Sequence, residues 1–267
     1  MKYVANAIFQ LIRSAPEFRG RNRILKNLLP FVNEVESFYG PKLAVRAGDT
    51  TFEASFFARY GNELVEIIEN LPEDGVFIEF GANTGVFSLV AARHLSNGHV
   101  ISIEPNPYVF RDLVKSKSIN HANNMTTFNF SIGEESTIVP FTFDETHTGK
   151  GHIENTKEYA DCSIVLINAD EFAKLVPNVS EREVLCKVDT EGSELTILKA
   201  LKSCGLIDCI YKFYIEIDDR YLSAHGHTVD DVYRFMSGCN FKPETTRRGM
   251  RHYDEIFVRT RHAEQAD

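Results

Sequence analysis

The chain has 267 residues, of which 43% are hydrophobic and 25% are charged, and its formal net charge is −9. These proportions leave room for one sizeable α/β domain with an extension. The negative charge argues against a general nucleic-acid binder, which needs a basic surface, so we expect no nucleic-acid partner. No apolar run is long enough to span a bilayer, and the five cysteines contain no Cys-x-x-Cys pair, so we expect a cytoplasmic protein.

The first 30 residues differ in charge from the rest of the chain. They hold six basic side chains and one acidic one, a net +5, which leaves −14 on the remainder. Val4, Ile8, Phe9 and Ile12 share one face of a predicted helix, and a second short amphipathic helix follows. We expect these helices to pack as a cap on the main domain. The alternative is a surface that binds anionic lipid or a lipid-linked substrate.

A short strand is predicted at 43–45 and an amphipathic helix at 62–71, and strands and helices alternate from there onward. We therefore divide the chain into an N-terminal helical extension (1–71), a main domain (72–260) and a polar tail (261–267). We see no internal repeat and no low-complexity linker that would indicate a second independent domain.

The stretch 76–85 contains the strongest signal in the chain. Apolar residues lead into Glu79, and Gly81 and Gly85 then bracket a short turn before an amphipathic helix. Glycines permit a sharp turn and a close approach to a ligand, and the next helix begins with free N–H groups. Dinucleotides such as NAD and S-adenosylmethionine (SAM) are two ligand classes bound by such a turn, while a strand–turn–helix without a ligand is the plainer alternative.

Glu79 distinguishes between the two ligands. Its carboxylate would repel the pyrophosphate of NAD, whereas the ammonium and sulfonium groups of SAM would attract it. The spacing also lacks the third glycine of the dinucleotide fingerprint. SAM is therefore the favoured ligand. The residues expected to bind it in this stretch are Glu79, Gly81, Ala82, Asn83, Thr84 and Gly85.

The next predicted strand, 100–103, ends in Glu104, about 20 residues after the glycine turn, which is the spacing of a ribose-binding carboxylate. Asn106 is a good N-cap for the following helix, and Pro107 suits its first position. A strand is predicted at 125–130 and a weaker hairpin strand at 138–143.

The segment 147–152 is polar and rich in glycine, and we predict a mobile loop over the acceptor site there. A buried strand at 184–188 then leads into Asp189 and Glu191, and a further strand at 210–217 ends near Glu216. Glu79, Glu104, Asp189 and Glu216 are thus acids at the ends of four predicted parallel strands, which place them at one edge of the sheet. Asp189 and Glu191 also suit the N-terminus of the next helix.

Four motifs carry a resemblance to the FkbM family, which covers about residues 49–260. They are Glu79-Phe80-Gly81-Ala82-Asn83-Thr84-Gly85, Glu104-Pro105-Asn106-Pro107, Lys187-Val188-Asp189-Thr190-Glu191-Gly192-Ser193-Glu194 and Tyr214-Ile215-Glu216. The family usually has Asp-Ile-Gly at 79–81 and Leu-Asp at 169–170. Here Glu79 keeps the charge of the first motif, and the second difference is one of packing.

The resemblance implies a SAM-dependent O-methyltransferase with a Rossmann-like class I fold. That fold has a mostly parallel seven-stranded sheet in the order 3-2-1-4-5-7-6, helices on both faces and an antiparallel last strand. The strand–helix alternation from residue 76 onward supports the same architecture. Family members methylate hydroxyls of macrolide natural products and bacterial glycans, so the implied acceptor is a hydroxyl of a sugar, a glycan or another small molecule.

The site implied by the resemblance has two parts. Besides the glycine turn, the cofactor-binding residues are Glu104, Pro105, Asn106, Ser131, Ile132 and Asp189, with Ser131-Ile132 near the adenine. An acceptor hydroxyl must lose its proton, and a carboxylate or histidine can take it. The expected catalytic residues are Asp189, Glu191 and Glu216, with His225 and His227 as further choices. A divalent ion held by Asp189 and Glu216 is an open alternative.

Two other functions compete with this interpretation. One is a NAD-linked oxidoreductase or epimerase, which Glu79 and the missing third glycine disfavour. The other is a non-catalytic SAM-binding partner protein, which the acids at all four strand ends disfavour. Equilibrium binding of SAM against NAD distinguishes the first of these from a methyltransferase.

Overall fold

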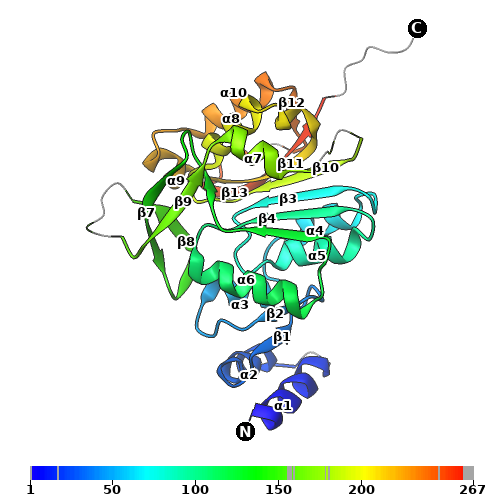
Figure 1. Ribbon diagram of the computed structural model, residues 1–267. Helices are drawn as coiled ribbons and strands as arrows, with labels where there is room; N and C mark the ends of the chain where they lie inside the picture. Colours follow the sequence, from blue (N-terminus) through cyan, green and yellow to red (C-terminus); the bar gives the residue numbers. More distant parts are fainter. Residues whose placement is uncertain are drawn as a thin grey trace.

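A seven-stranded sheet forms the centre of the computed structural model, which describes residues 2–260 apart from 17, 155–157, 159, 178, 180 and 246 (Figure 1). The predicted polar tail lies outside the described residues. The strands of the sheet are β3 (Val76–Phe80), β4 (His99–Ile103), β5 (Met125–Phe128), β10 (Val184–Val188), β11 (Ile210–Asp218), β12 (Phe241–Pro243) and β13 (His252–Arg259).

The spatial order of these strands is β12-β13-β11-β10-β3-β4-β5. Counted along the chain this is 3-2-1-4-5-7-6 read from the other edge, so the predicted order is confirmed. The pairs from β5 to β11 are parallel, while β13 runs antiparallel to both of its neighbours. The expected antiparallel last strand is therefore present as well.

Both faces of the sheet are covered by helices, as predicted (Figure 1). Side chains alternate along a strand, so Phe77 of β3 packs into one core and Ile78 into the other. One core takes side chains from α7 (Ala169–Leu175), α8 (Glu194–Ser203), α9 (Asp219–Ala224) and α10 (Val229–Gly238). The other takes them from α3 (Thr50–Phe56), α4 (Asn62–Glu69), α5 (Val86–His94) and α6 (Pro107–Ile119).

The N-terminal segment begins with α1 (Lys2–Ser14), α2 (Arg21–Leu28) and the 3-10 turn η1 (Leu29–Phe31). A small antiparallel hairpin of β1 (Glu34–Glu36) and β2 (Lys42–Ala44) follows. Figure 1 shows α1 and α2 at the end of the molecule that lies farthest from α10. Phe9 and Leu25 belong to the same core as Phe77 of the central sheet, and the division at residue 71 stays a prediction.

A second sheet is inserted in the chain between β5 and β10. Its strands are β6 (Ser131–Ile132), β7 (Thr137–Asp144), β8 (His147–Ile153) and β9 (Cys162–Ile167), in the order β6-β9-β7-β8. The predicted hairpin strand at 138–143 is confirmed by β7, but the predicted loop at 147–152 is wrong because it is strand β8, paired antiparallel with β7. Gly151 permits this close pairing, because a Cβ at that position would lie 2.6 Å from the ring of Phe141.

Among the described residues, no helix combines the length and the apolar character needed to cross a membrane.

Candidate active site

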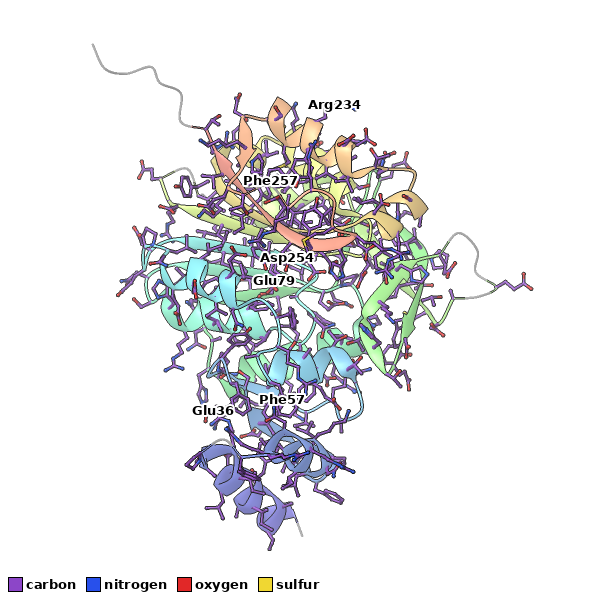
Figure 2. All side chains as sticks on the ribbon, turned by 180° about the vertical axis from the view of Figure 1, so that it is seen from behind. Glu36, Phe57, Glu79, Arg234, Asp254 and Phe257 are labelled. Carbon is purple, nitrogen blue, oxygen red and sulfur yellow. The ribbon has the colours of Figure 1, made fainter. Side chains whose placement is uncertain are left out.

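A cavity of about 270 Å³ lies at the carboxyl ends of β3, β4, β10 and β11. Parallel strands end at the same edge of a sheet, so each of these four strands delivers one acid to the cavity. The four acids are Glu79, Glu104, Asp189 and Glu216, which the strand-end pattern singled out. Figure 2 shows Glu79 in the middle of the molecule, where its side chain is only 1% exposed.

The turn after β3 has the sharp backbone that its glycines predict. Gly81 and Gly85 have φ angles of 80° and 85°, and Asn83 between them has φ 49°. A Cβ at Gly81 would lie 1.8 Å from the carbonyl oxygen of Asp189. Glycine is therefore required at this position both by the backbone conformation and by the close approach of the chain leaving β10.

Glu104 joins the ends of β3 and β4. One carboxylate oxygen accepts a hydrogen bond from the backbone N–H of Asn83 and the other from that of Asn106, both at 2.8 Å. Burial raises the pKa of Glu104 to about 7, although both hydrogen bonds oppose the rise. Each oxygen keeps a further lone pair, so the group can accept two more hydrogen bonds from a ligand in the cavity.

Glu79 is engaged by the protein itself. One oxygen accepts hydrogen bonds from the backbone N–H and the hydroxyl of Ser88, at the start of α5. The other lies 3.4 Å from the ammonium of Lys187. Burial raises the pKa of Glu79, and Lys187 opposes that rise. Glu79 thus lines the cavity as one half of a buried ion pair.

Lys187 also holds Asp189, at 2.8 Å between its ammonium nitrogen and Oδ2. Burial would raise the pKa of Asp189, but Lys187 and a hydrogen bond with Glu216 keep it below its ordinary value. Burial and the negative charge of Asp189 raise the pKa of Glu216 to about 8. The two carboxyl groups therefore form a pair in which Asp189 holds the charge and Glu216 titrates near neutral pH.

His252 completes this row of charges from the antiparallel strand β13. Its Nε2 lies 2.8 Å from Oε1 of Glu216, and that hydrogen bond raises the pKa of His252 to about 9. The side chain of His252 is 54% exposed, whereas that of Glu216 is 14% exposed. His252 thus places a positive charge between the partly buried carboxyl pair and solvent.

Glu191 lies in the tight turn that follows β10. Its φ of 53° is unusual for a residue with a side chain, and Gly192 follows with φ 108°. Burial, together with the nearby charges of Glu216 and Asp189, raises the pKa of Glu191 to about 10. Glu191 is therefore a neutral carboxylic acid at physiological pH, able to donate a hydrogen bond into the cavity that it lines.

The roof of the cavity comes from α3 and the inserted strand β8. The hydroxyl of Thr148 donates to the carboxylate of Asp49 at 2.6 Å, and the side-chain amide of Asn83 donates to that hydroxyl at 3.2 Å. Asp49 is also the N-cap of α3. This chain of hydrogen bonds ties the roof to the glycine turn below it.

The other predicted residues divide into cavity-lining and supporting groups. Ala82, Pro105 and Ser131 line the cavity. The remaining four lie next to it and support its walls: Thr84 and Ile132 are buried, Gly85 is the N-cap of α5, and Asn106 is the N-cap of α6. The proposed cap role of Asn106 is confirmed, because its side chain accepts from the backbone N–H of Tyr108 at 3.0 Å.

The two predicted histidines do not belong to the cavity lining. His225 ends α9, where its Nδ1 lies 2.9 Å from the carbonyl oxygen of Tyr221. His227 lines a separate surface hollow between α8 and α10. In the part of the chain that the structure describes, no group of three or more His, Cys, Asp or Glu side chains is arranged to hold a metal ion.

From the sequence, no role was assigned to Lys187, to His252 or to the Asp49–Thr148 pair. A lysine in the middle of an apolar strand is rare, because burying its charge requires a partner, so Lys187 carried a usable signal. The segment 147–152 was expected over the acceptor site, and Thr148 lines the cavity. The partners of His252 and Thr148 could not be predicted, because they lie 36 and 99 residues away in the chain and only the tertiary fold brings them close.

The strand order, the glycine turn and the acids at the strand ends define a Rossmann-like class I methyltransferase. The family model described as "Methyltransferase FkbM domain" matches residues 79–243, which is more than half of the chain. The chain therefore belongs to the FkbM methyltransferase family.

A curated protein named "Methyltransferase 1" from Beauveria bassiana is 24% identical over 149 residues, which cover 49% of this chain and 59% of that protein. Among solved structures, the precorrin-6y C5,15-methyltransferase of Geobacter metallireducens is 13% identical, with a TM-score of 0.42, over 74% of this chain and 89% of that one. TYW2 of M. jannaschii, solved with AdoMet, is 12% identical, with a TM-score of 0.43, over 85% and 87% of the two chains.

Proposed function

We propose that this methyltransferase uses SAM and transfers the methyl group to a hydroxyl of a sugar, a glycan or another small natural product. When bound, SAM supplies an electrophilic methyl group on a positively charged sulfur. The observation that carries the proposal is the Asp189–Glu216 carboxyl pair, which faces the same cavity as the Glu104 carboxylate.

The cavity fits the nucleoside part of SAM. Glu104 is buried beside the glycine turn, where its carboxylate would accept the two ribose hydroxyls. Its raised pKa comes chiefly from burial, and hydrogen bonds to the charged form lower a pKa, so ribose hydroxyls would stabilise the ionised carboxylate. Ser131 and Asp189 also line the cavity, where Ser131 would contact the adenine and Asp189 the methionine end of SAM.

The residues around Glu216 suit the removal of a proton from an alcohol. With SAM bound, the acceptor oxygen would take the methyl group from the sulfonium sulfur and would give its proton to the Glu216 carboxylate. Glu216 is a stronger base than an ordinary carboxylate because burial and Asp189 raise its pKa to about 8. The positive charge of His252, whose pKa is raised to about 9, favours the return of Glu216 to its ionised form, while Lys187 holds Asp189 in place.

The acids also favour a polyol acceptor. Ionised carboxylates accept hydrogen bonds from hydroxyls, and the neutral Glu191 can donate one to a hydroxyl or ether oxygen. His152 and the glycines of β8 close the cavity from the roof side. A carbohydrate-like molecule offers the hydroxyls that this lining can orient.

The test is to incubate the protein with SAM and a panel of sugars, glycans and hydroxylated small molecules, and to examine the products by mass spectrometry. The expected product carries one added methyl group on oxygen. Calorimetric titrations with SAM and with NAD accompany the assay. Binding of NAD without SAM, or methylation of nitrogen or carbon in place of oxygen, would contradict the proposal.

A further inference from the structure

The N-terminal helices carry apolar side chains that the protein does not cover. Val4, Ile8 and Leu11 of α1 are 63%, 42% and 74% exposed. They follow the spacing i, i+4, i+7, which places them in one stripe along the helix. Ala5, Phe9 and Ile12 form a neighbouring stripe, and these three belong to or pack against the core. The helix therefore has more apolar surface than its packing uses, and the face predicted from Val4, Ile8, Phe9 and Ile12 is divided between core and exterior.

Exposed apolar side chains continue beyond α1. Phe18 lies in the turn before α2, Ile24 lies on α2, and Phe31 ends η1, and each is at least 40% exposed. Figure 1 shows these elements together at one end of the molecule, and Figure 2 shows the same lobe from behind, next to Glu36. Aliphatic and aromatic side chains gathered on short surface helices mark a binding surface.

The charge of this lobe indicates what it binds. Residues 1–30 carry a net +5, whereas the rest of the chain carries −14. Arg13 forms an ion pair with Glu36 and Lys26 forms one with Glu53. Arg19 and Arg23 are exposed and neighbour Phe18 and Ile24 in the chain. Basic amphipathic helices with exposed apolar side chains suit the surface of an anionic bilayer. A second copy of the chain suits it less, because two basic surfaces would repel each other.

We propose that α1, α2 and η1 form a docking surface for anionic lipid membranes, with the stripe Val4–Ile8–Leu11 inserted among the lipid chains. The exposed arginines would meet the lipid phosphates, so the attraction should weaken as salt screens it. The docking surface is separate from the cavity, whose lining contains no residue before Thr50 among those that the structure describes.

The full chain is tested by co-sedimentation with vesicles of phosphatidylcholine, with and without phosphatidylserine. The proposal expects binding to the phosphatidylserine vesicles that falls as salt is raised, and little binding to pure phosphatidylcholine. Equal binding to both kinds of vesicle, or none to either, would overturn it.

A matched pair of variants separates the apolar stripe from charge alone. Ile8→Asp/Leu11→Asp and Asn6→Asp/Gln10→Asp each add two negative charges to α1, but Asn6 and Gln10 lie on exposed positions outside the stripe. The first variant should lose at least about tenfold in vesicle affinity relative to the second, because burial of a single such aliphatic side chain is worth about that factor. Equal loss in the two variants would contradict insertion of the stripe.

Two further measurements distinguish a loss of vesicle binding from a loss of the fold. Circular dichroism and SAM titration of each variant report whether the fold and the cavity are intact, independently of the proposed reaction. If the double variant does not fold, Leu11→Asp alone, at the most exposed position of the stripe, replaces it. Analytical ultracentrifugation that shows a dimer broken by Ile8→Asp/Leu11→Asp, without vesicle binding, would reassign the surface to self-association.

Discussion

The floor and the roof of the cavity are built in different ways. The floor consists of the ends of β3, β4, β10 and β11, and every residue of β3 and β10 is buried. The roof consists of α3 and the inserted strand β8, and all but one of the residues of β8 are partly or fully exposed. The floor carries ionised groups that are held by buried partners, whereas the roof is tied to it by hydrogen bonds through Thr148.

From this difference we expect the floor to carry out the chemical step and the roof to position the ligand. Charges in a buried setting interact strongly, so the floor is where pKa values shift and where a proton can be moved. A hydrogen bond contributes less, so the roof is expected to adjust how well a ligand is held without changing the chemical step. Substitutions in the floor should therefore have larger effects than substitutions in the roof.

The largest effect is expected from Glu216→Gln. The amide keeps the shape of the side chain but cannot accept a proton, so the turnover number should fall by about 10²–10⁴-fold, the range for a lost general base. Glu244→Gln, at an acid that lies outside the cavity lining, is the control and should leave turnover unchanged. Equal turnover in the Glu216 variant and the wild type would remove Glu216 from the reaction.

Asp189→Asn distinguishes two roles for the other member of the pair. Asparagine removes the negative charge that Lys187 holds and that raises the pKa of Glu216. If Asp189 takes part in proton removal, turnover should fall by about 10²–10⁴-fold. If Asp189 only contacts the methionine end of SAM, the Michaelis constant for SAM should rise while turnover at saturation is largely kept.

An intermediate effect is expected from Glu104→Ala. Loss of hydrogen bonds to a charged group costs roughly 1.5–3 kcal/mol, which corresponds to about a ten- to hundredfold weaker affinity for SAM in calorimetry. Glu66→Ala, an exposed acid on α4, is the control. Unchanged affinity in the Glu104 variant would place the ribose elsewhere.

The raised pKa of Glu104 predicts how the affinity for SAM depends on pH. Burial raises the pKa of Glu104 to about 7, and ribose hydroxyls donate to its ionised form, so binding favours the deprotonated carboxylate. Affinity should therefore rise with pH up to about 7 and level off above it, and Glu104→Ala should remove this dependence. A fall in affinity for SAM with rising pH over that range would contradict the prediction.

A smaller effect is expected in the roof from Thr148→Val. Valine has nearly the same shape but cannot bridge Asp49 and Asn83, so the link between roof and glycine turn is lost. Each lost hydrogen bond is worth roughly 0.5–1.5 kcal/mol, so the Michaelis constant for SAM should rise by about two- to tenfold with little change in turnover. Thr137→Val, at an exposed position of β7, is the control. A loss of turnover as large as that from Glu216→Gln would break the distinction between floor and roof.

The smallest change is expected from His252→Gln, which alters a pH profile. Without the positive charge of His252 the ionised form of Glu216 is less favoured, so the pKa of Glu216 rises further above about 8. The rising limb of kcat/KM against pH should move to higher pH, while the rate at its plateau changes little. An unmoved profile would show that His252 does not interact with the titrating group.

Features of the floor that depend on neighbouring residues could be predicted from the sequence. The glycine turn, the cap at Asn106 and the strand-end acids Glu79 and Glu104 are all set within about 30 residues by backbone sterics and by the pattern of buried strands. The FkbM resemblance added the strand order, and the structure has that order.

Only the tertiary structure decided which groups surround each acid. Lys187 lies between Glu79 and Asp189 because β10 pairs with β3 in parallel register, with Lys187 opposite Glu79. His252 reaches Glu216 because β13 pairs antiparallel with β11, and Thr148 reaches Asp49 because the inserted strand β8 folds over α3. Strand pairing and burial act between residues that are distant in the chain, so the pKa values and the roof of the cavity follow from the fold and not from any local pattern.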